Sequence, residues 1–139
     1  PWDSKAAGLY MICTLSKHEA EDAGFDDALM LDYRGYVSEA TGANIFISFD
    51  HDDELHTPIP DCFLNGITRQ TVIKLAKARG IKVIERVILP EELKQAKQIF
   101  LTGTAAEVTP VGRIDIYEYS VGEMTRCLRE DYEQLVGKG

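Results

Sequence analysis

The sequence predicts a mixed α/β fold, because two kinds of apolar pattern alternate along its 139 residues. Short apolar or β-branched runs, such as residues 28–31 and 44–48, are typical of strands. Residues 71–79 instead carry apolar side chains at helical spacing, and Gly80 ends that pattern. A chain of this length buries one core of its own. We therefore expect residues 1–139 to form a single domain of sheet and packed helices.

In the first part of the chain we expect a helix and then three strands. Apolar positions within residues 10–23, followed by Gly24, predict a helix of about four turns. A turn-like stretch at 32–35 lies between the apolar runs 28–31 and 36–39, which predicts a β-hairpin. Residues 44–48 then continue as a third strand.

Residues 51–56 read as an exposed turn, and the prolines within 57–60 prevent regular ladder pairing and lead the chain out of the sheet. The turn holds several side chains of metal-binding type, namely His51, Asp52, Asp53, Glu54 and His56. Neighbouring residues of an extended turn point in different directions, so few of them converge on one ion. A solvated hairpin tip is favoured over a metal site, and we expect no metal.

The second half alternates helix and strand in the same way. The predicted elements are a helix at 71–79, a strand at 81–87, a short helix from Pro90 to about Lys97, a strand at 99–101, an edge strand at 113–119 and a closing amphipathic helix at 123–136.

Composition excludes several classes of partner. A formal net charge of -8 and a pI near 4.8 argue against nucleic acid, whose phosphates require a basic face. No apolar run approaches the roughly 18 residues of a membrane span, and no signal segment opens the chain. The 3 cysteines are widely spaced and fit reduced thiols better than a disulfide framework. We expect a cytoplasmic protein with no nucleic-acid or membrane partner.

Two segments contain residues suited to a carbonyl-type cofactor that carries a phosphate. Lys5 and Tyr10 are five positions apart, and an amine can form a Schiff base while a phenol donates to a ring oxygen. Gly66 precedes the clearest helix, so the N–H groups of Ile67 and Thr68 can meet an anion at its positive end. The local sequence alone leaves alternatives open: Tyr10 as an ordinary buried aromatic, and Thr68 as a cap of its own helix.

These segments and two others, residues 37–44 and 101–110, occur in an order that resembles the branched-chain amino acid aminotransferases. Those enzymes are members of the class IV (fold type IV) group that depends on pyridoxal 5'-phosphate. The resemblance covers essentially the whole chain. It implies a curved, pseudo-barrel sheet with packed helices, like the large C-terminal domain of fold type IV enzymes. It also implies transfer of amino groups between branched-chain L-amino acids and 2-oxoglutarate.

The resemblance further implies a role for each matching residue. Lys5 holds the cofactor as a Schiff base and moves the substrate proton, Tyr10 donates to the ring oxygen, and Glu39 faces the pyridine nitrogen. The remaining implied contacts are the cofactor ring on Leu64, the phosphate at Ile67, Thr68 and Thr104, and the substrate carboxylate at the backbone of Thr104 and Ala105.

Other interpretations remain beside this one. The same fold supports a D-amino acid aminotransferase or an aminodeoxychorismate lyase. The chain also opens at Pro1, immediately before Lys5, which suggests the C-terminal domain of a longer protein whose small N-terminal domain is absent. Such a piece is expected to be inactive alone, and at the extreme to be a silent folded fragment. The parent is expected to be a dimer or higher homo-oligomer that acts on amino acid and 2-oxo acid substrates.

Overall fold

The structure is a computed structural model that describes residues 9–14, 27–32, 34–40, 43–49, 53–59, 66–103 and 107–137. The strands are β1 (Leu9–Thr14), β2 (Asp27–Leu31), β3 (Val37–Ala40), β4 (Asn44–Ser48), β5 (Glu54–Thr57), β6 (Lys82–Glu85), β7 (Gln98–Gly103), β8 (Glu107–Ile114) and β9 (Tyr117–Glu118). The helices are α2 (Ile67–Ala78), the 3-10 helix η1 (Pro90–Gln95) and α3 (Glu123–Leu135).

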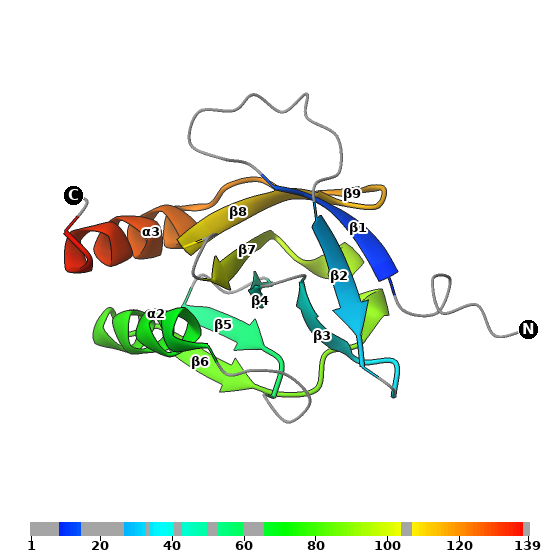
Figure 1. Cartoon of the computed structure of the whole chain (residues 1–139), viewed down its shortest axis with the longest axis horizontal. Helices are drawn as coiled ribbons and strands as arrows, with labels where there is room; N and C mark the ends of the chain where they lie inside the picture. Colours follow the sequence, from blue (N-terminus) through cyan, green and yellow to red (C-terminus); the bar gives the residue numbers. More distant parts are fainter. Residues whose placement is uncertain are drawn as a thin grey trace, which may run out of the picture.

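The strands form one sheet, and Figure 1 shows how strongly it curls. Its order is β3-β2-β1-β8-β7-β4-β5-β6, with β9 paired to β8. Every pairing is antiparallel except β5 with β6, which is parallel and needs α2 as its crossover. The predicted mixed α/β class with a curved sheet is confirmed.

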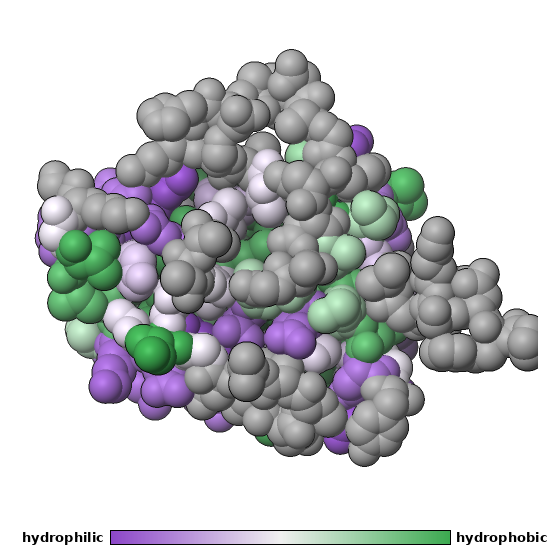
Figure 2. Space-filling view, in the orientation of Figure 1, coloured by the Kyte–Doolittle hydropathy of each residue, from purple (hydrophilic) through white to green (hydrophobic). Residues whose placement is uncertain are grey.

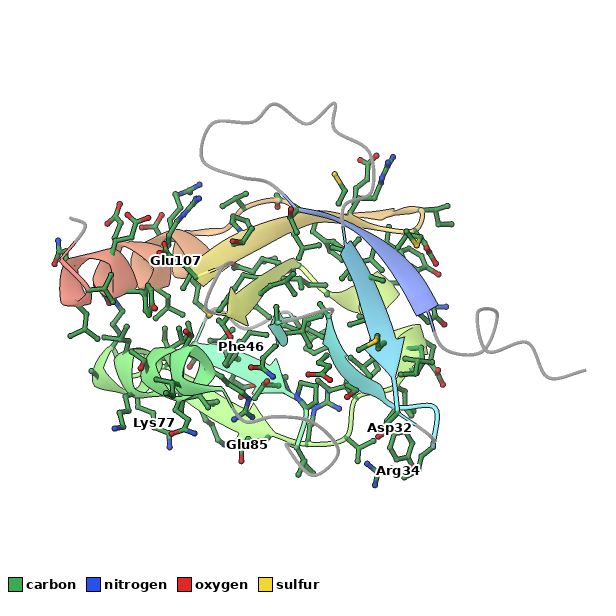
Figure 3. All side chains as sticks on the ribbon, in the orientation of Figure 1. Asp32, Arg34, Phe46, Lys77, Glu85 and Glu107 are labelled. Carbon is green, nitrogen blue, oxygen red and sulfur yellow. The ribbon has the colours of Figure 1, made fainter. Side chains whose placement is uncertain are left out.

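Two apolar clusters hold the fold together. The inner core fills the concave side of the sheet, with Ile12, Leu29, Ile45 and Leu101 among its fully or almost fully buried members. The helix-side core lies between the sheet and the helices, and consists of Phe46, Leu55, Val72, Ala76, Phe100, Val108, Met124 and Leu128. Figure 3 labels Phe46 in this layer. The rings of Phe46 and Phe100 stack with centroids 5.1 Å apart, which ties β4 to β7 on the helix side.

The predicted hairpin, third strand and clear helix are confirmed. β2 and β3 pair antiparallel across a turn in which the Asp32 carboxylate accepts from the Arg34 backbone and side chain and from the Tyr36 backbone. Figure 3 labels Asp32 and Arg34 at this turn. Gly35 has a φ of 87°, a left-handed conformation that glycine adopts without strain.

The helix predicted over 10–23 is wrong where the structure describes it. Residues 9–14 form β1, in which Tyr10 and Ile12 contact the inner core while Met11 between them is exposed. That alternation has a period of two, and pairing with both β2 and β8 stabilises the extended form. The rest of the predicted helix, Gly24 included, lies outside the described residues.

Three further boundaries differ from the sequence prediction. Residues 54–56 of the predicted turn and Thr57 of the predicted loop belong to β5, where Leu55 is fully buried while its neighbours Glu54 and His56 lie on the other face. His51 and Asp52 lie outside the described residues. The predicted strand at 113–119 is instead the end of β8, a turn at Asp115 and the short β9, and β8 is a central strand. The short helix after Pro90 is of the 3-10 type.

On the face seen in Figure 2, hydrophobic and hydrophilic groups are interspersed, and apolar groups reach the surface over the two helices. The exposed apolar side chains include Ile67, Ile116 and Leu135. In the described part of the chain, no helix combines the length and the apolar character needed to cross a membrane.

We predict that replacing Gly80, the residue after the end of α2, destabilises the protein. Its φ is 83°, and the N–H groups of Gly80 and Ile81 donate to the carbonyls of Lys77 and Ala76 in a Schellman motif. A Gly80→Ala change should lower the free energy of unfolding by about 1–2 kcal/mol, because the left-handed conformation disfavours a Cβ. Urea titration measures this loss. The matched control is Lys74→Ala on the exposed face of α2, which should be nearly neutral; equal midpoints for both variants would contradict the assignment.

Candidate active site

The first turn of α2 has the features that favour an anion. Gly66 is the N-cap and has no side chain with which to cap the helix, and the first turn contains no acidic residue. A Cβ built on Gly66 would lie 3.1 Å from Asn44 Oδ1, so the backbone approaches β4 closely here. The N–H groups of Ile67 and Thr68 have no partner within the helix itself. An anion at this end is favoured by these donors and by the helix dipole.

Arg69 anchors this helix end to the sheet. Its side chain is fully buried, and one guanidinium nitrogen donates to Glu85 Oε2 at 2.8 Å and to the Pro58 carbonyl at 3.1 Å. These contacts join α2 to β6 and to the loop that follows β5. The position of the first turn of α2 therefore depends on a buried charged group that is held by β6 and by the loop after β5.

Glu39 lies on β3 as a half-buried carboxylate. Burial raises the pKa of this side chain above its ordinary value, and no cation among the described residues lowers it again. In the described part of the chain, Glu39 forms no ion pair. A partly desolvated carboxylate without a cation is energetically unfavourable, and a positively charged ligand atom would relieve that cost.

Glu39 is linked to the start of α2 through a short backbone path. Ala40 and Ala43 exchange N–H···O bonds of 2.9 and 3.1 Å across the end of β3. Asn44 follows Ala43 directly, and its side chain lies beside Gly66. The end of β3, the start of β4 and the start of α2 thus meet at one edge of the sheet.

Tyr10 lies in the same half of the sheet but on another face. It pairs with Leu29 and packs against the inner core, whereas Glu39 pairs with Met30. Because successive side chains of a strand point to opposite faces, the registers direct Tyr10 and Glu39 to opposite sides of the strands. The structure brings Ile67 and Thr68 together at one helix end, with Glu39 near that edge, and leaves Tyr10 on the concave side.

The other expected site residues lie outside the described residues. They are Lys5, Leu64, Thr104 and Ala105. Thr104 and Ala105 come between two described residues that pair with each other: Gly103 at the end of β7 and Glu107 at the start of β8. Glu107 has a φ of 53°, which is costly for a residue with a Cβ and is typical of positions held by their surroundings.

Asn44 and Thr102 were not chosen as site residues from the sequence. They are direct partners across β4 and β7, so both side chains lie on one face beside the start of α2. Thr102 Oγ1 is buried and forms no hydrogen bond in the described part of the structure. Both residues belong to segments recognised in the sequence, but only the cross-strand register brings these segments together.

The residues of this edge fit the pyridoxal phosphate that the resemblance implies. An uncapped helix start suits a phosphate, and a carboxylate without a cation among the described residues suits a protonated ring nitrogen. The edge offers no comparable arrangement for a metal: within the described ranges, no three histidine, cysteine, aspartate or glutamate side chains lie close enough together to hold an ion.

Curated proteins similar to this chain are aminotransferases. The probable branched-chain-amino-acid aminotransferase of Rickettsia bellii is 44% identical over 140 residues, which cover 98% of this chain and 48% of the relative. The branched-chain-amino-acid aminotransferase of Pseudomonas aeruginosa is 41% identical over 136 residues, covering 96% of this chain and 44% of the relative. The chain therefore spans about half the length of the curated relatives it matches.

Solved structures show the same fold. The branched-chain aminotransferase of Thermoproteus uzoniensis with norvaline has a TM-score of 0.77 and 44% identity, over 83% of this chain and 39% of that one. The branched-chain amino acid aminotransferase of Escherichia coli has a TM-score of 0.73 and 40% identity, over 81% of this chain and 39% of that one.

The motifs and the curled sheet agree with a match along most of the sequence. The model of the family described as "Amino-transferase class IV" matches residues 3–114. The chain belongs to the class IV aminotransferase family.

Proposed function

We propose that this chain is the cofactor-binding part of a pyridoxal-phosphate-dependent aminotransferase acting on branched-chain L-amino acids and 2-oxoglutarate. The observation that carries the proposal is Glu39, a half-buried carboxylate without a cation partner among the described residues, near an uncapped helix start. The two features offer complementary charge to the two ends of one cofactor: a carboxylate for the ring nitrogen, and N–H groups for the phosphate.

Pyridoxal phosphate supplies an aldehyde that takes up the amino group and a ring that withdraws electrons from the substrate α-carbon. The Lys5 amine would bind that aldehyde covalently and, once released, move the proton at the substrate α-carbon. Glu39 would hold the proton on the ring nitrogen, since a nearby negative charge favours the protonated form. Tyr10 would donate a hydrogen bond to the ring oxygen; this role rests on the family motif alone, because the strand register turns Tyr10 to the opposite face from Glu39. The family motifs support these roles.

The remaining contacts would orient cofactor and substrate. Ile67 and Thr68 would donate their backbone N–H groups to the phosphate, and Thr104 would bind it from the loop after β7. Leu64 would pack under the ring. The backbone of Thr104 and Ala105 would bind the substrate carboxylate. The glycine N-cap supports the phosphate position, because it supplies no side chain that would take up the first N–H groups of the helix.

The branched-chain substrate class is supported by the names of the relatives, which are branched-chain-amino-acid aminotransferases. The two other activities considered for the fold, D-amino acid transamination and aminodeoxychorismate cleavage, have no observation that favours them. We further propose a homo-oligomer in the cytoplasm. The exposed apolar side chains Ile67 and Ile116 support association, and Cys127, a free thiol, agrees with a reducing compartment.

The covalent role of Lys5 can be tested by absorption spectroscopy with added pyridoxal phosphate. The protein should become yellow, and the colour should be fixed by borohydride as a covalent adduct, because reduction traps a bond between amine and aldehyde. Lys5→Ala should abolish the adduct, while the exposed-lysine variant Lys74→Ala should keep it. Loss of colour from both variants alike, or retention by Lys5→Ala, would contradict the role. No colour in the unaltered chain would support a silent fragment.

Glu39→Gln should slow the chemical step more than it weakens cofactor binding. A neutral amide no longer holds the ring nitrogen in its protonated form, and the electron-withdrawing power of the ring falls. Single-turnover rates with a branched-chain amino acid report the chemical step, and cofactor titration reports affinity. A variant that loses affinity and keeps its single-turnover rate would refute the ring-nitrogen role.

The same change should stabilise the cofactor-free protein at neutral pH. Burial raises the pKa of Glu39, so the folded state binds this proton more tightly than the unfolded state does. The charged carboxylate thus costs stability above its folded pKa, and the cost vanishes below the ordinary glutamate pKa. Urea midpoints should be higher for Glu39→Gln at pH 7 and converge with the unaltered protein as the pH falls through that range. Exposed Glu118→Gln is the control; a lower midpoint for Glu39→Gln at pH 7 would overturn the argument.

A further inference from the structure

A cavity of about 350 Å³ lies on the helix side of the sheet, away from the start of α2. It is lined by Arg79, Ile81, Lys97, Gln98, Ser120, Gly122, Glu123, Met124 and Cys127. Arg79 follows the C-terminal end of α2, and that helix of 12 residues is about 18 Å long. The cavity is therefore separated from the candidate phosphate position by the length of α2. Its volume lies at the small end of the range of ligand sites.

Gln98 shows that the cavity is built to receive a hydrogen-bond acceptor. Its side chain is buried, with 6% exposed, at the start of β7. Its Oε1 accepts from the backbone N–H of Thr125 at 3.1 Å and from Thr125 Oγ1 at 2.6 Å. A backbone N–H can only donate, so these contacts fix which end of the amide is oxygen. The Nε2 group lies against Gly122, which also lines the cavity, and donates to no described residue.

The start of α3 adds backbone donors to the same cavity. Gly122 is the N-cap of α3 and has no side chain with which to cap it. The N–H group of Thr125 is already bound to Gln98. The N–H groups of Glu123 and Met124 come before it in the first turn and are left without intrahelical partners. Two donors of this turn are therefore open to a ligand.

The remaining walls define the charge and shape of that ligand. Lys97 supplies an ammonium group that forms no ion pair with the described residues. Arg79 is already paired, with one nitrogen 3.0 Å from Asp131 Oδ1, so Lys97 is the main unpaired cation of the lining. Glu123 and Asp131 add negative charge nearby, which disfavours an anion of more than one charge. The cavity also has an apolar wall, made by Ile81 and Met124 and continuous with the helix-side core.

We propose that this cavity is a second, non-catalytic site that binds a small organic monocarboxylate with a short apolar chain. The carboxylate accepts from Gln98 Nε2, from the first N–H groups of α3 and from Lys97. The chain packs on Ile81 and Met124. The site contains none of the residues assigned to the cofactor or substrate.

The test is NMR titration of the protein with 3-methylbutanoate, a probe with one carboxylate and a branched apolar chain. Saturable shifts are expected at the Gln98 side-chain amide and at the backbone amides of Glu123 and Met124. Lys97→Met should weaken binding about five- to tenfold, the effect of one charge-assisted contact at a partly exposed position. Lys94→Met removes the same charge from an exposed residue outside the cavity lining and should leave affinity unchanged.

A second variant, Gly122→Ala, blocks the site sterically. A Cβ on Gly122 would lie 2.3 Å from Gln98 Nε2, so Gly122→Ala must displace the amide and should abolish the titration. If that variant fails to fold, the comparison of Lys97→Met with Lys94→Met still tests the proposal. The proposal is overturned by the absence of saturable shifts at these amides, by shifts confined to Gly66, Ile67 and Thr68, or by equal weakening in the two lysine variants, which would indicate general charge attraction.

Discussion

The fold depends on the burial of β4 and β7 on both faces. Ile45 and Leu101 point into the inner core, while Phe46 and Phe100 point into the helix-side core. A strand with two apolar faces requires a covering layer on each side. The curled sheet supplies one layer and the pair α2 and α3 supplies the other. Because α2 must cover this strand pair, its first turn is fixed beside the polar ends of the two strands.

The polar residues at those ends are therefore a consequence of the packing. Asn44 begins β4 and Thr102 lies near the end of β7, where the apolar cores give way to the candidate site. Arg69 strengthens the same arrangement, since its buried guanidinium joins α2 to Glu85 of β6. The helix start is thus held from the sheet side by contacts that leave its first N–H groups without an intrahelical partner.

Local signals in the sequence predicted the elements that local chemistry determines. The turn before β3, the Gly80 end of α2 and the residues of β4 were predicted because turn residues and helical spacing act over a few positions. The strand at residues 9–14 was misread as helix, since only its two sheet neighbours select the extended form. For the site, the segments were recognised, but the side of the sheet that each residue faces is a property of strand register, as Tyr10 and Glu39 illustrate.

The two long helices, α2 and α3, begin in the same way but are proposed to bind anions of different charge. Each begins at a glycine that provides no side-chain cap, so each presents free N–H groups and a positive dipole end. The first turn of α2 contains no acidic residue, which suits a phosphate with about two negative charges. The first turn of α3 contains Glu123, and this carboxylate already takes up part of the favourable potential. The start of α3, assisted by Gln98 and Lys97, can therefore still stabilise an anion with a single carboxylate. The one acidic residue Glu123 thus distinguishes the monocarboxylate proposed for α3 from the phosphate proposed for α2.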